Sequence, residues 1–374
     1  MKSSKNRIES LIDGSGNSFY SHAGKVKILK AHYEKLGSEL GTHSFDDSWK
    51  EEVSNSVKLF EAMSFCDSHF NGMLDQTITL AEVSHVVKAI KNNKAAGSDG
   101  IVGELIKYGG KPMCEMLLTL FNLVWNNEFV PSYWREGLIV SLFKKGDRED
   151  PGNYRGITLL DVIGKLYCRV INNRLLKYLE LNGKLHEGQG GFRIGRSCID
   201  NIFSLTELIQ GRIKEGKFTY AFFLDVKKAY DSVWRDGLWY KMWEMGIKGK
   251  LWRVIRSLYV NNRSCVFLEG KSSEFFPINQ GVAQGCTLSP TLFLIYIDGL
   301  LSEIEKCSQL GVKFSENEMS GLLFADDFVG LAESGPALQN LIDIVYDYSK
   351  RWRFEANVKK CAVVVFFKSR QSFR

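Results

Sequence analysis

Apolar residues recur along this chain with two different periods, and each period predicts a different kind of element. After the capping-box sequence Thr79–Glu82, apolar side chains follow every three or four positions up to Ile90, which is typical of a helix. Similar spacing predicts helices over 113–125, 164–176, 202–213 and 336–352, and a loop that begins at Asn153 leads into the second of them. Short continuous apolar runs bounded by polar residues predict strands over 136–143, 220–224 and 361–367, and a β-hairpin over 321–334.

The order of these elements predicts the fold class. In the second half of the chain, the strand 220–224 is followed by helices, then by the hairpin, a helix and a last strand. Ser289 and Pro290 have the residue types expected where a helix begins. Strands and helices in this arrangement favour an α+β fold in which helices back a small sheet.

Three aspartates lie at the ends or tips of the predicted strands. Asp225 follows the strand 220–224, whereas Asp326 and Asp327 lie in the middle of the predicted hairpin. If these strands are neighbours, three carboxylates converge at one edge of the sheet, and such a cluster requires cations. Oxygen ligands of this kind suit Mg²⁺, and two such ions can clamp the reacting oxygens in phosphoryl transfer. Taken alone, the pair Asp326–Asp327 is equally typical of a solvated turn.

Composition and charge narrow the class of protein only slightly. The chain has 374 residues, with a formal net charge of +6, which permits but does not require nucleic-acid binding. Its eight cysteines are scattered without zinc-ligand spacing and suggest free thiols in a reducing compartment. No signal peptide or membrane-spanning run is evident. We therefore expect an intracellular protein and no membrane partner.

Seven ordered motifs give the sequence a resemblance to a known family. The segments FFLDVKKAYDSV, GVAQGCTLSP, LLFADD and WRFEANVKKC resemble the palm of reverse transcriptases from non-LTR (LINE-type) retrotransposons. Upstream, KAAGSDGI, LFKKGD with NYRGITLL, and QGGFRIGRS are similar to the fingers motifs of that family. The resemblance implies a right-hand polymerase with fingers over 76–215 and a palm over 216–374. It leaves 1–75 as an N-terminal linker or extension.

The resemblance also implies an activity and roles for particular residues. The implied activity is RNA-directed DNA polymerisation with two Mg²⁺ ions, a template RNA, a primer DNA 3′ end and deoxynucleoside triphosphates. The resemblance also implies a nuclear or cytoplasmic ribonucleoprotein. Asp225, Asp326 and Asp327 match the catalytic metal-binding triad. Tyr230, expected on a helix after the strand 220–224, matches the aromatic residue that rejects a ribose 2′-hydroxyl.

Further residues match the family's nucleotide and nucleic-acid contacts. By the resemblance, Lys144 and Arg155 grip the triphosphate, and Gln284 and Gly285 lie against the incoming nucleotide and the template. Lys360 matches a lysine near the leaving pyrophosphate. Two arginines of the glycine-rich segment, Arg193 and Arg196, are candidates for template or primer backbone contacts, or else belong to an ordinary basic loop. The helix with Lys165, Arg169 and Arg174 is likewise a candidate for backbone contacts, or else an ordinary amphipathic helix.

The sequence departs from the family pattern in two respects. Gly156 stands where the family usually has proline, and the chain stops soon after Lys360, so we expect the palm to be incomplete and the thumb to be missing. Two other functions therefore stay open. One is a catalytically compromised copy that only binds RNA or primer–template. The other is a group II intron maturase-like reverse transcriptase.

Overall fold

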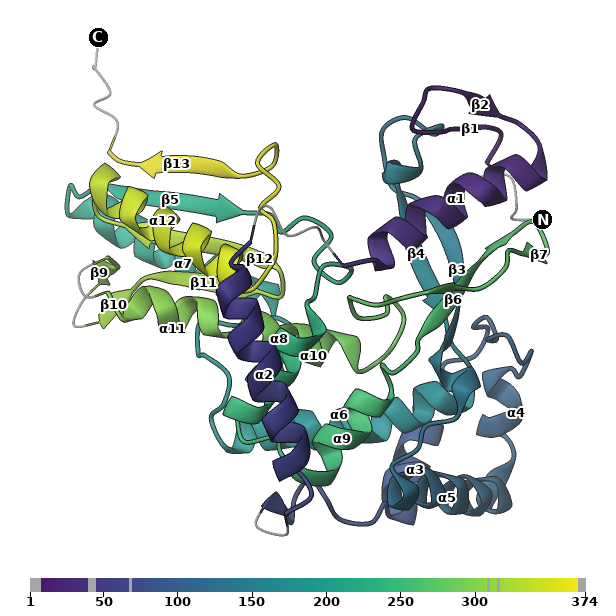
Figure 1. Cartoon of the computed structure of the whole chain (residues 1–374). Coiled ribbons are helices and arrows are strands. Elements are labelled where there is room, and N and C mark those ends of the chain that lie inside the picture. The colour runs from purple at the N-terminus through teal and green to yellow at the C-terminus, as the bar shows by residue number, and fades with distance from the viewer. Residues whose placement is uncertain (1–7, 40–44, 67–68, 308–309, 315–316, 369–374) are drawn as a thin grey trace. The chain divides into compact units, whose positions relative to one another are not determined.

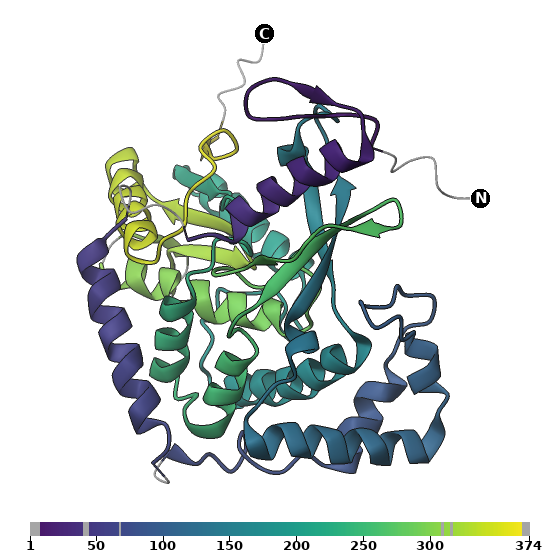
Figure 2. The ribbon, with the colours of Figure 1, turned by 45° about the vertical axis from the view of Figure 1, so that its right-hand side comes forward.

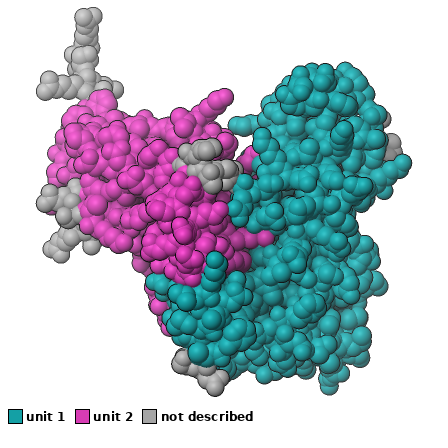
Figure 3. All heavy atoms as spheres, in the orientation of Figure 1, with its two compact units in different colours: residues 1–40, 58–175, 242–289 teal, residues 41–57, 176–241, 290–374 magenta. Residues whose placement is uncertain are grey.

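The computed structural model describes residues 8–39, 45–66, 69–307, 310–314 and 317–368. The chain forms two compact units, coloured separately in Figure 3. Unit 1 combines residues 1–40, 58–175 and 242–289, and unit 2 combines 41–57, 176–241 and 290–374. No helix among the described residues is both long enough and apolar enough to cross a membrane.

Unit 1 is built around a five-stranded sheet with the order β4-β3-β6-β7, in which β8 also pairs with β6. Strand β3 runs antiparallel to β4 and parallel to β6. The strands are β3 (Glu136–Phe143), β4 (Tyr154–Leu159), β6 (Arg263–Leu268), β7 (Lys271–Ser272) and β8 (Phe276–Pro277). The pairing of β3 with β6 explains why residues 242–289 belong to this unit. The boundaries expected from the sequence, after residues 75 and 215, stay a prediction.

One face of this sheet is covered by the N-terminal segment, which the sequence left without a role. Helix α1 (His22–Gly37) lies along the sheet, next to the short pair β1 (Leu11–Ile12) and β2 (Ser18–Phe19) (Figures 1 and 2). Tyr33 of α1 packs in one cluster with Ile139 and Tyr154. A Cβ at Gly156 would lie 2.7 Å from the Tyr33 ring, so glycine here lets α1 approach β4.

The helices of unit 1 confirm most of the periodicity. Helix α3 (Leu80–Lys88) has the expected capping box, in which Thr79 and Glu82 bond each other's backbone N–H groups. The segment 154–159, expected as a loop, is instead strand β4 because it pairs with β3 over its whole length. The remaining helical segments of this unit are α4 (Gly103–Lys107), α5 (Gly110–Asn127), η3 (Ser132–Arg135), η4 (Pro151–Asn153) and α9 (Gly249–Ser257).

Unit 2 contains a four-stranded antiparallel sheet with the order β11-β12-β5-β13. Its strands are β5 (Thr219–Leu224), β11 (Gly321–Phe324), β12 (Asp327–Ala332) and β13 (Ala362–Phe366), and the pair β9 (Val312–Phe314) and β10 (Asn317–Met319) lies apart from it. Leu208 and Ile209 of α7 (Cys198–Lys214) pack with Ala221 and Leu331 on one face. Leu341 of α12 (Gly335–Arg351) meets Gly330 on the other face, and α11 (Gly299–Glu305) packs against α12 (Figure 1). The predicted small sheet backed by helices is therefore present.

Four helices include residues of both units: α2 (Asp47–Met63), α6 (Val162–Leu181), α8 (Arg235–Glu244) and α10 (Ser289–Ile297). Helix α10 begins at Ser289, one residue before Pro290, which the sequence predicted as its first residue. Helix α7 begins four residues before the expected Ile202, at Cys198, because Ser197 and Asp200 form a second capping box. Capping satisfies backbone N–H groups that the first helical turn leaves unpaired.

Candidate active site

The three predicted acids lie at one end of the unit 2 sheet. In the pairing of β12 with β5, Phe328 lies opposite Leu224, so the next pair in register is Asp327 and Asp225. Asp326 lies in the two-residue turn that joins β11 to β12. Directly opposed residues of antiparallel strands project to the same face, so Asp225 and Asp327 are neighbours. The pairing of β11 with β12 confirms the expected hairpin.

The turn beside these acids is held by Gln189, a residue for which the sequence suggested no role. Ala325 adopts a φ of +58°, a left-handed conformation that costs an alanine about 1–2 kcal/mol. The fully buried Gln189 side chain accepts a hydrogen bond from the Ala325 N–H at 3.0 Å and donates one to the Ala325 carbonyl at 3.5 Å. These contacts fix the conformation of the turn that carries Asp326.

The glycine-rich segment continues this support on the edge of the sheet. Leu323 of β11 receives a bond from the Gly190 N–H and donates one to the Gly188 carbonyl, both at 2.8 Å. A Cβ at Gly191 would lie 2.1 Å from the Ala325 nitrogen, so only glycine permits this approach. In the sequence, this contact was signalled by the QGGFR motif alone. The resemblance had placed that motif in the fingers and not beside the acidic hairpin.

Asp225 is bound by Lys360 in this structure. The Lys360 ammonium donates to both carboxylate oxygens of Asp225, at 3.0 and 2.8 Å. The loop before Lys360 is fastened to the same end of β5, because Asn357 N–H donates to the Asp225 carbonyl and Lys227 N–H donates to the Glu355 carbonyl. Lys360 therefore forms an ion pair with one of the candidate acids, and its place near a leaving pyrophosphate stays a prediction.

The chemistry of these donors suits a divalent cation. Across the described residues, no group of three or more His, Cys, Asp or Glu side chains is arranged to hold a metal ion. Mg²⁺ is, however, usually bound by one or two protein carboxylates together with substrate phosphates. The neighbouring Asp225 and Asp327, with Asp326 in the adjoining turn, meet that smaller requirement with oxygen ligands alone.

Tyr230 lies near the same acids. The sequence predicted that it lies on a helix, and this prediction is wrong. Residues 227–232 form turns, with Lys228 at a φ of +50°, and α8 begins only at Arg235. The Tyr230 ring stacks on Phe293 of α10, with centroids 5.5 Å apart. Burial and the charge of Asp326 raise the pKa of Tyr230 to about 12, so its hydroxyl stays protonated at neutral pH.

Lys144 and Arg155 lie at the end of the β3–β4 hairpin of unit 1. Arg155 pairs in register with Leu142, and Lys144 follows two residues after Leu142, so both cations belong to the same face of the hairpin. The opposite face, with Ile139 and Tyr154, is the one covered by α1. Both side chains are exposed, and neither forms a hydrogen bond or ion pair with any residue the structure describes.

Gln284 and Gly285 lie in a loop of unit 1 that packs on strand β4. The Thr158 N–H donates to the Gln284 carbonyl at 2.8 Å. Gly285 has a φ of +145°, and a Cβ there would lie 2.2 Å from the Thr158 carbonyl oxygen. Close packing of the backbone therefore requires glycine at this position.

The two arginines of the glycine-rich segment differ sharply. Arg193 has a side chain that is only 5% exposed, and its guanidinium donates to the Glu180 carboxylate and to the carbonyls of His186 and Gln189. This position contradicts the suggested nucleic-acid contact for Arg193, because its donors are used within the protein. Arg196 is 40% exposed and pairs with the exposed Glu187.

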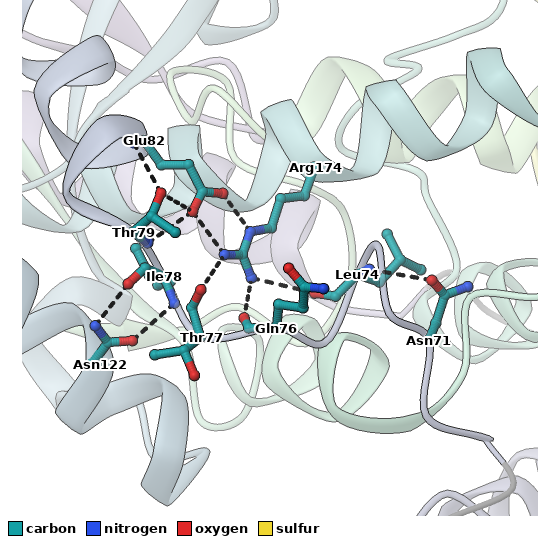
Figure 4. A network of polar contacts seen from close by, with 9 residues as sticks. All are labelled: Asn71, Leu74, Gln76, Thr77, Ile78, Thr79, Glu82, Asn122 and Arg174. Atoms are coloured by element: carbon teal, nitrogen blue, oxygen red, sulfur yellow. Dashed lines mark hydrogen bonds and ion pairs between the residues drawn. The ribbon is translucent and has the colours of Figure 1, made fainter.

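Arg174 of α6 also has an internal role. Its guanidinium bonds both oxygens of Glu82, at 2.6 and 2.8 Å, and donates to the carbonyls of Gln76 and Thr77 (Figure 4). Asn122 bonds the neighbouring Ile78 backbone in the same network (Figure 4). The hydrogen-bond donors of Arg174 are thus used within the protein, a role that the sequence did not suggest.

Comparison with known proteins gives the chain a family. The family model described as "Reverse transcriptase (RNA-dependent DNA polymerase)" matches residues 143–373. The RNA-directed DNA polymerase from mobile element jockey of Drosophila melanogaster is 26% identical over 295 residues, which is 77% of this chain and 32% of that protein. The probable RNA-directed DNA polymerase from transposon X-element, also of Drosophila melanogaster, is 28% identical over 97% of this chain and 38% of its own length.

A third relative comes from another element. The Retrovirus-related Pol polyprotein from type-1 retrotransposable element R2 of Popillia japonica is 28% identical over 76% of this chain and 38% of that protein. The chain thus spans about a third of the length of the curated relatives it matches. Since the family model covers more than half of the sequence, including all three candidate acids, this chain belongs to the reverse transcriptase (RNA-dependent DNA polymerase) family.

Proposed function

We propose that this chain is the fingers and palm of an RNA-directed DNA polymerase that extends a primer 3′ end with deoxynucleotides on an RNA template. Unit 2, with its antiparallel sheet, corresponds to the palm, and unit 1 corresponds to the fingers. The observation that carries the proposal is the register of β5 and β12, which makes Asp225 and Asp327 neighbours and puts Asp326 in the adjoining turn.

Asp225, Asp326 and Asp327 would hold two Mg²⁺ ions together with phosphate oxygens of the substrate. When bound, Mg²⁺ activates the primer 3′-hydroxyl as a nucleophile and neutralises the triphosphate. The protein's contribution is to fix the carboxylates, through strand pairing and the contacts of Gln189 with Ala325. Lys360 forms an ion pair with Asp225, so either this ammonium or a bound Mg²⁺ would balance the charge of the Asp225 carboxylate.

The other site residues would bind the substrates. Lys144 and Arg155 are exposed cations without an internal partner among the described residues, as binding of triphosphate oxygens requires. The rigidly stacked ring of Tyr230 would face the nucleotide sugar. Gln284 and Gly285 would contact the nucleotide and template through their tightly packed loop.

Primer extension on an RNA template, with deoxynucleotides and with or without Mg²⁺, tests the proposal. We expect Mg²⁺-dependent extension that Asp326→Asn abolishes. Asp347→Asn, an exposed position on α12 of the same unit, is the matched control and should leave extension unchanged. If the chain binds RNA but Mg²⁺ and Asp326→Asn have no effect on any extension, the proposal fails, and binding without catalysis is the remaining function.

A further inference from the structure

The N-terminal segment 8–37 contacts both elements of unit 1 that carry proposed nucleotide-binding residues. One element is the β3–β4 hairpin, with Lys144 and Arg155, and the other is the loop that carries Gln284 and Gly285. Helix α1 of this segment lies along the unit 1 sheet (Figure 2). A part of the chain for which the sequence suggested no role is therefore placed to affect both elements.

At the hairpin, the contact is a buried hydrogen bond behind Arg155. The hydroxyl groups of Tyr33 on α1 and Ser141 on β3 are hydrogen-bonded to each other at 2.9 Å, and the two residues are 5% and 9% exposed. Ser141 pairs in register with Gly156, the residue that follows Arg155 on β4. Neighbouring residues of a strand project to opposite faces, so Tyr33 holds the hairpin on the face opposite the Arg155 side chain.

The tip of the hairpin is fastened by the residues that precede α1. The Ile12 N–H donates to the Glu149 carbonyl at 2.9 Å, and the Ser10 hydroxyl donates to the Glu149 carboxylate. The buried ammonium of Lys25 donates to the Ile8 carbonyl at 2.8 Å, which ties this stretch to α1. The segment therefore holds the hairpin both along β3 and at its tip.

The last turn of α1 holds the start of the nucleotide loop. The Gly37 carbonyl accepts hydrogen bonds from the N–H groups of Asn279 and Gln280, at 2.7 and 3.2 Å. The Gln280 side chain donates to the Leu36 carbonyl at 3.0 Å. A Cβ at Gly37 would lie 2.6 Å from the Ile278 Cδ1 atom, so glycine lets the end of the helix approach this loop.

The two contacts are made by neighbouring turns on one side of the helix. Tyr33 and Gly37 are four residues apart in α1, so they lie on the same side, about 6 Å apart along its axis. Because the backbone of a helix is hydrogen-bonded throughout, the spacing of these two residues is fixed. Any element bound to Tyr33 therefore keeps a defined distance from any element bound to Gly37.

We propose that Tyr33 and Gly37 are positioning residues that hold the β3–β4 hairpin and the Gln284–Gly285 loop at a fixed spacing. The inference rests on the proposed function, which gives both elements the same substrate, an incoming deoxynucleotide. A nucleotide gripped at its triphosphate by one element and at its base by another is aligned for reaction only while that spacing is kept.

Loss of the hydrogen bond between Tyr33 and Ser141 tests the first contact. Tyr33→Phe should raise the KM for deoxynucleotides roughly fivefold, with a smaller change in kcat, because the hairpin is no longer held in place. Tyr33→Phe combined with Ser141→Ala removes both hydroxyls and leaves no unpaired group, so stability in urea should recover while the KM stays raised. Tyr133→Phe, at an exposed tyrosine of the same unit, should change neither quantity. A KM that recovers together with stability would overturn the positioning role of Tyr33.

Gly37→Ala tests the second contact. The added methyl group meets the Ile278 Cδ1 atom, so the loop has to shift, and misincorporation of nucleotides should increase. Ile278→Val removes this carbon atom, and in that background Gly37→Ala should have almost no effect. Gly14→Ala, where a Cβ meets no atom within 4 Å, is the control. Equal effects of Gly37→Ala with and without Ile278→Val would overturn the role of this contact.

Amide hydrogen exchange separates this inference from the proposed function, because it requires no primer extension. Exchange over 142–156 should speed up when both hydroxyls are removed, and exchange over 278–288 should speed up in Gly37→Ala. If exchange responds in this way but the unchanged protein extends no primer, the proposed function fails and the link between the two elements stands. Unchanged exchange in both variants would overturn the link, even where primer extension is normal.

Discussion

Two glycine- and arginine-containing segments of this chain use their cations in opposite ways. At the end of the β3–β4 hairpin, Lys144 and Arg155 are exposed and have no partner among the described residues. In the segment 188–197, Arg193 is buried and bonded to Glu180, and Gln189 supports the turn of the acidic hairpin. Both segments resemble fingers motifs of one family, yet the cations without an acidic partner among the described residues lie in the first.

The difference shows that the role of a basic motif depends on whether acidic residues lie within reach of its cations. Glu180 lies on α6, thirteen residues before Arg193, and its carboxylate receives two bonds from the guanidinium. The β3–β4 hairpin has no such acid in reach of Arg155 within the described part of the chain. Substitution in the first segment should therefore change function, and substitution in the second should change stability.

Arg193→Ala should have the largest effect, on stability. Removing one partner of a buried ion pair leaves the other charge without compensation and typically costs about 3–5 kcal/mol. We expect the free energy of unfolding, measured in urea, to fall by roughly 3 kcal/mol. Arg196→Ala is the matched control, because its pair is exposed and worth about 1 kcal/mol or less. A fully stable Arg193→Ala protein with weakened RNA binding would reverse the comparison.

Arg155→Ala and Lys144→Ala should show the opposite behaviour. Each substitution removes a charged group whose hydrogen bond to a phosphate contributes about 1.5–3 kcal/mol to binding. The KM for deoxynucleotides should therefore rise by roughly tenfold or more. Unfolding in urea should change by less than about 0.5 kcal/mol, because neither side chain has an internal partner among the described residues. Lys271→Ala, an exposed lysine of β7, should alter neither quantity. Loss of stability without a change in KM would contradict the assignment.

The pH dependence of stability should report the Glu180–Arg193 pair. The hydrogen bond and charge of Arg193 hold the pKa of Glu180 below its ordinary value of 4.5, although partial burial opposes this. A carboxylate with a lowered folded pKa stabilises the protein fully above its ordinary value, and this contribution is lost as the pH falls through the folded value. Glu180→Gln should therefore cost about 1 kcal/mol at neutral pH, and the difference from the unchanged protein should vanish in acid.

The control for that measurement is Glu244→Gln, at an exposed position of α8. It makes the same chemical change without removing a bond to arginine, so its effect on stability should not depend on pH in this range. An acid-independent cost for Glu180→Gln would show that packing, rather than charge, stabilises the segment.

Ala325→Gly should have the smallest effect and should stabilise the turn. Glycine adopts the positive φ of this position without steric cost, and its greater backbone entropy in the unfolded chain offsets part of the gain. We expect a net increase of about 0.5 kcal/mol in the unfolding free energy. In a Gln189→Ala background the gain should be smaller, as measured by a double-mutant cycle, because without Gln189 the alanine can relax out of the strained conformation. Equal gains in both backgrounds would mean that Gln189 acts elsewhere.

Much of the sheet of unit 2 was predictable from local signals. The hairpin around Asp326 and Asp327, the strand before Asp225 and the helix 335–351 all appeared as clear periodic patterns, and each is present. Strand β4 and the position of Tyr230 were predicted wrongly. Both depend on contacts outside the segment, since β4 exists through its pairing with β3 and the turns around Tyr230 lie beside the loop at Glu355.

The sequence by itself determined the family, the acids and the order of the elements, because motifs, caps and periodicity are local properties of the chain. Only the tertiary structure decided which residues serve the site and which hold it together. It placed Lys360 on Asp225 and Gln189 on the hairpin turn. Each of these contacts joins residues more than a hundred positions apart, and neither spacing nor composition specifies such a partner.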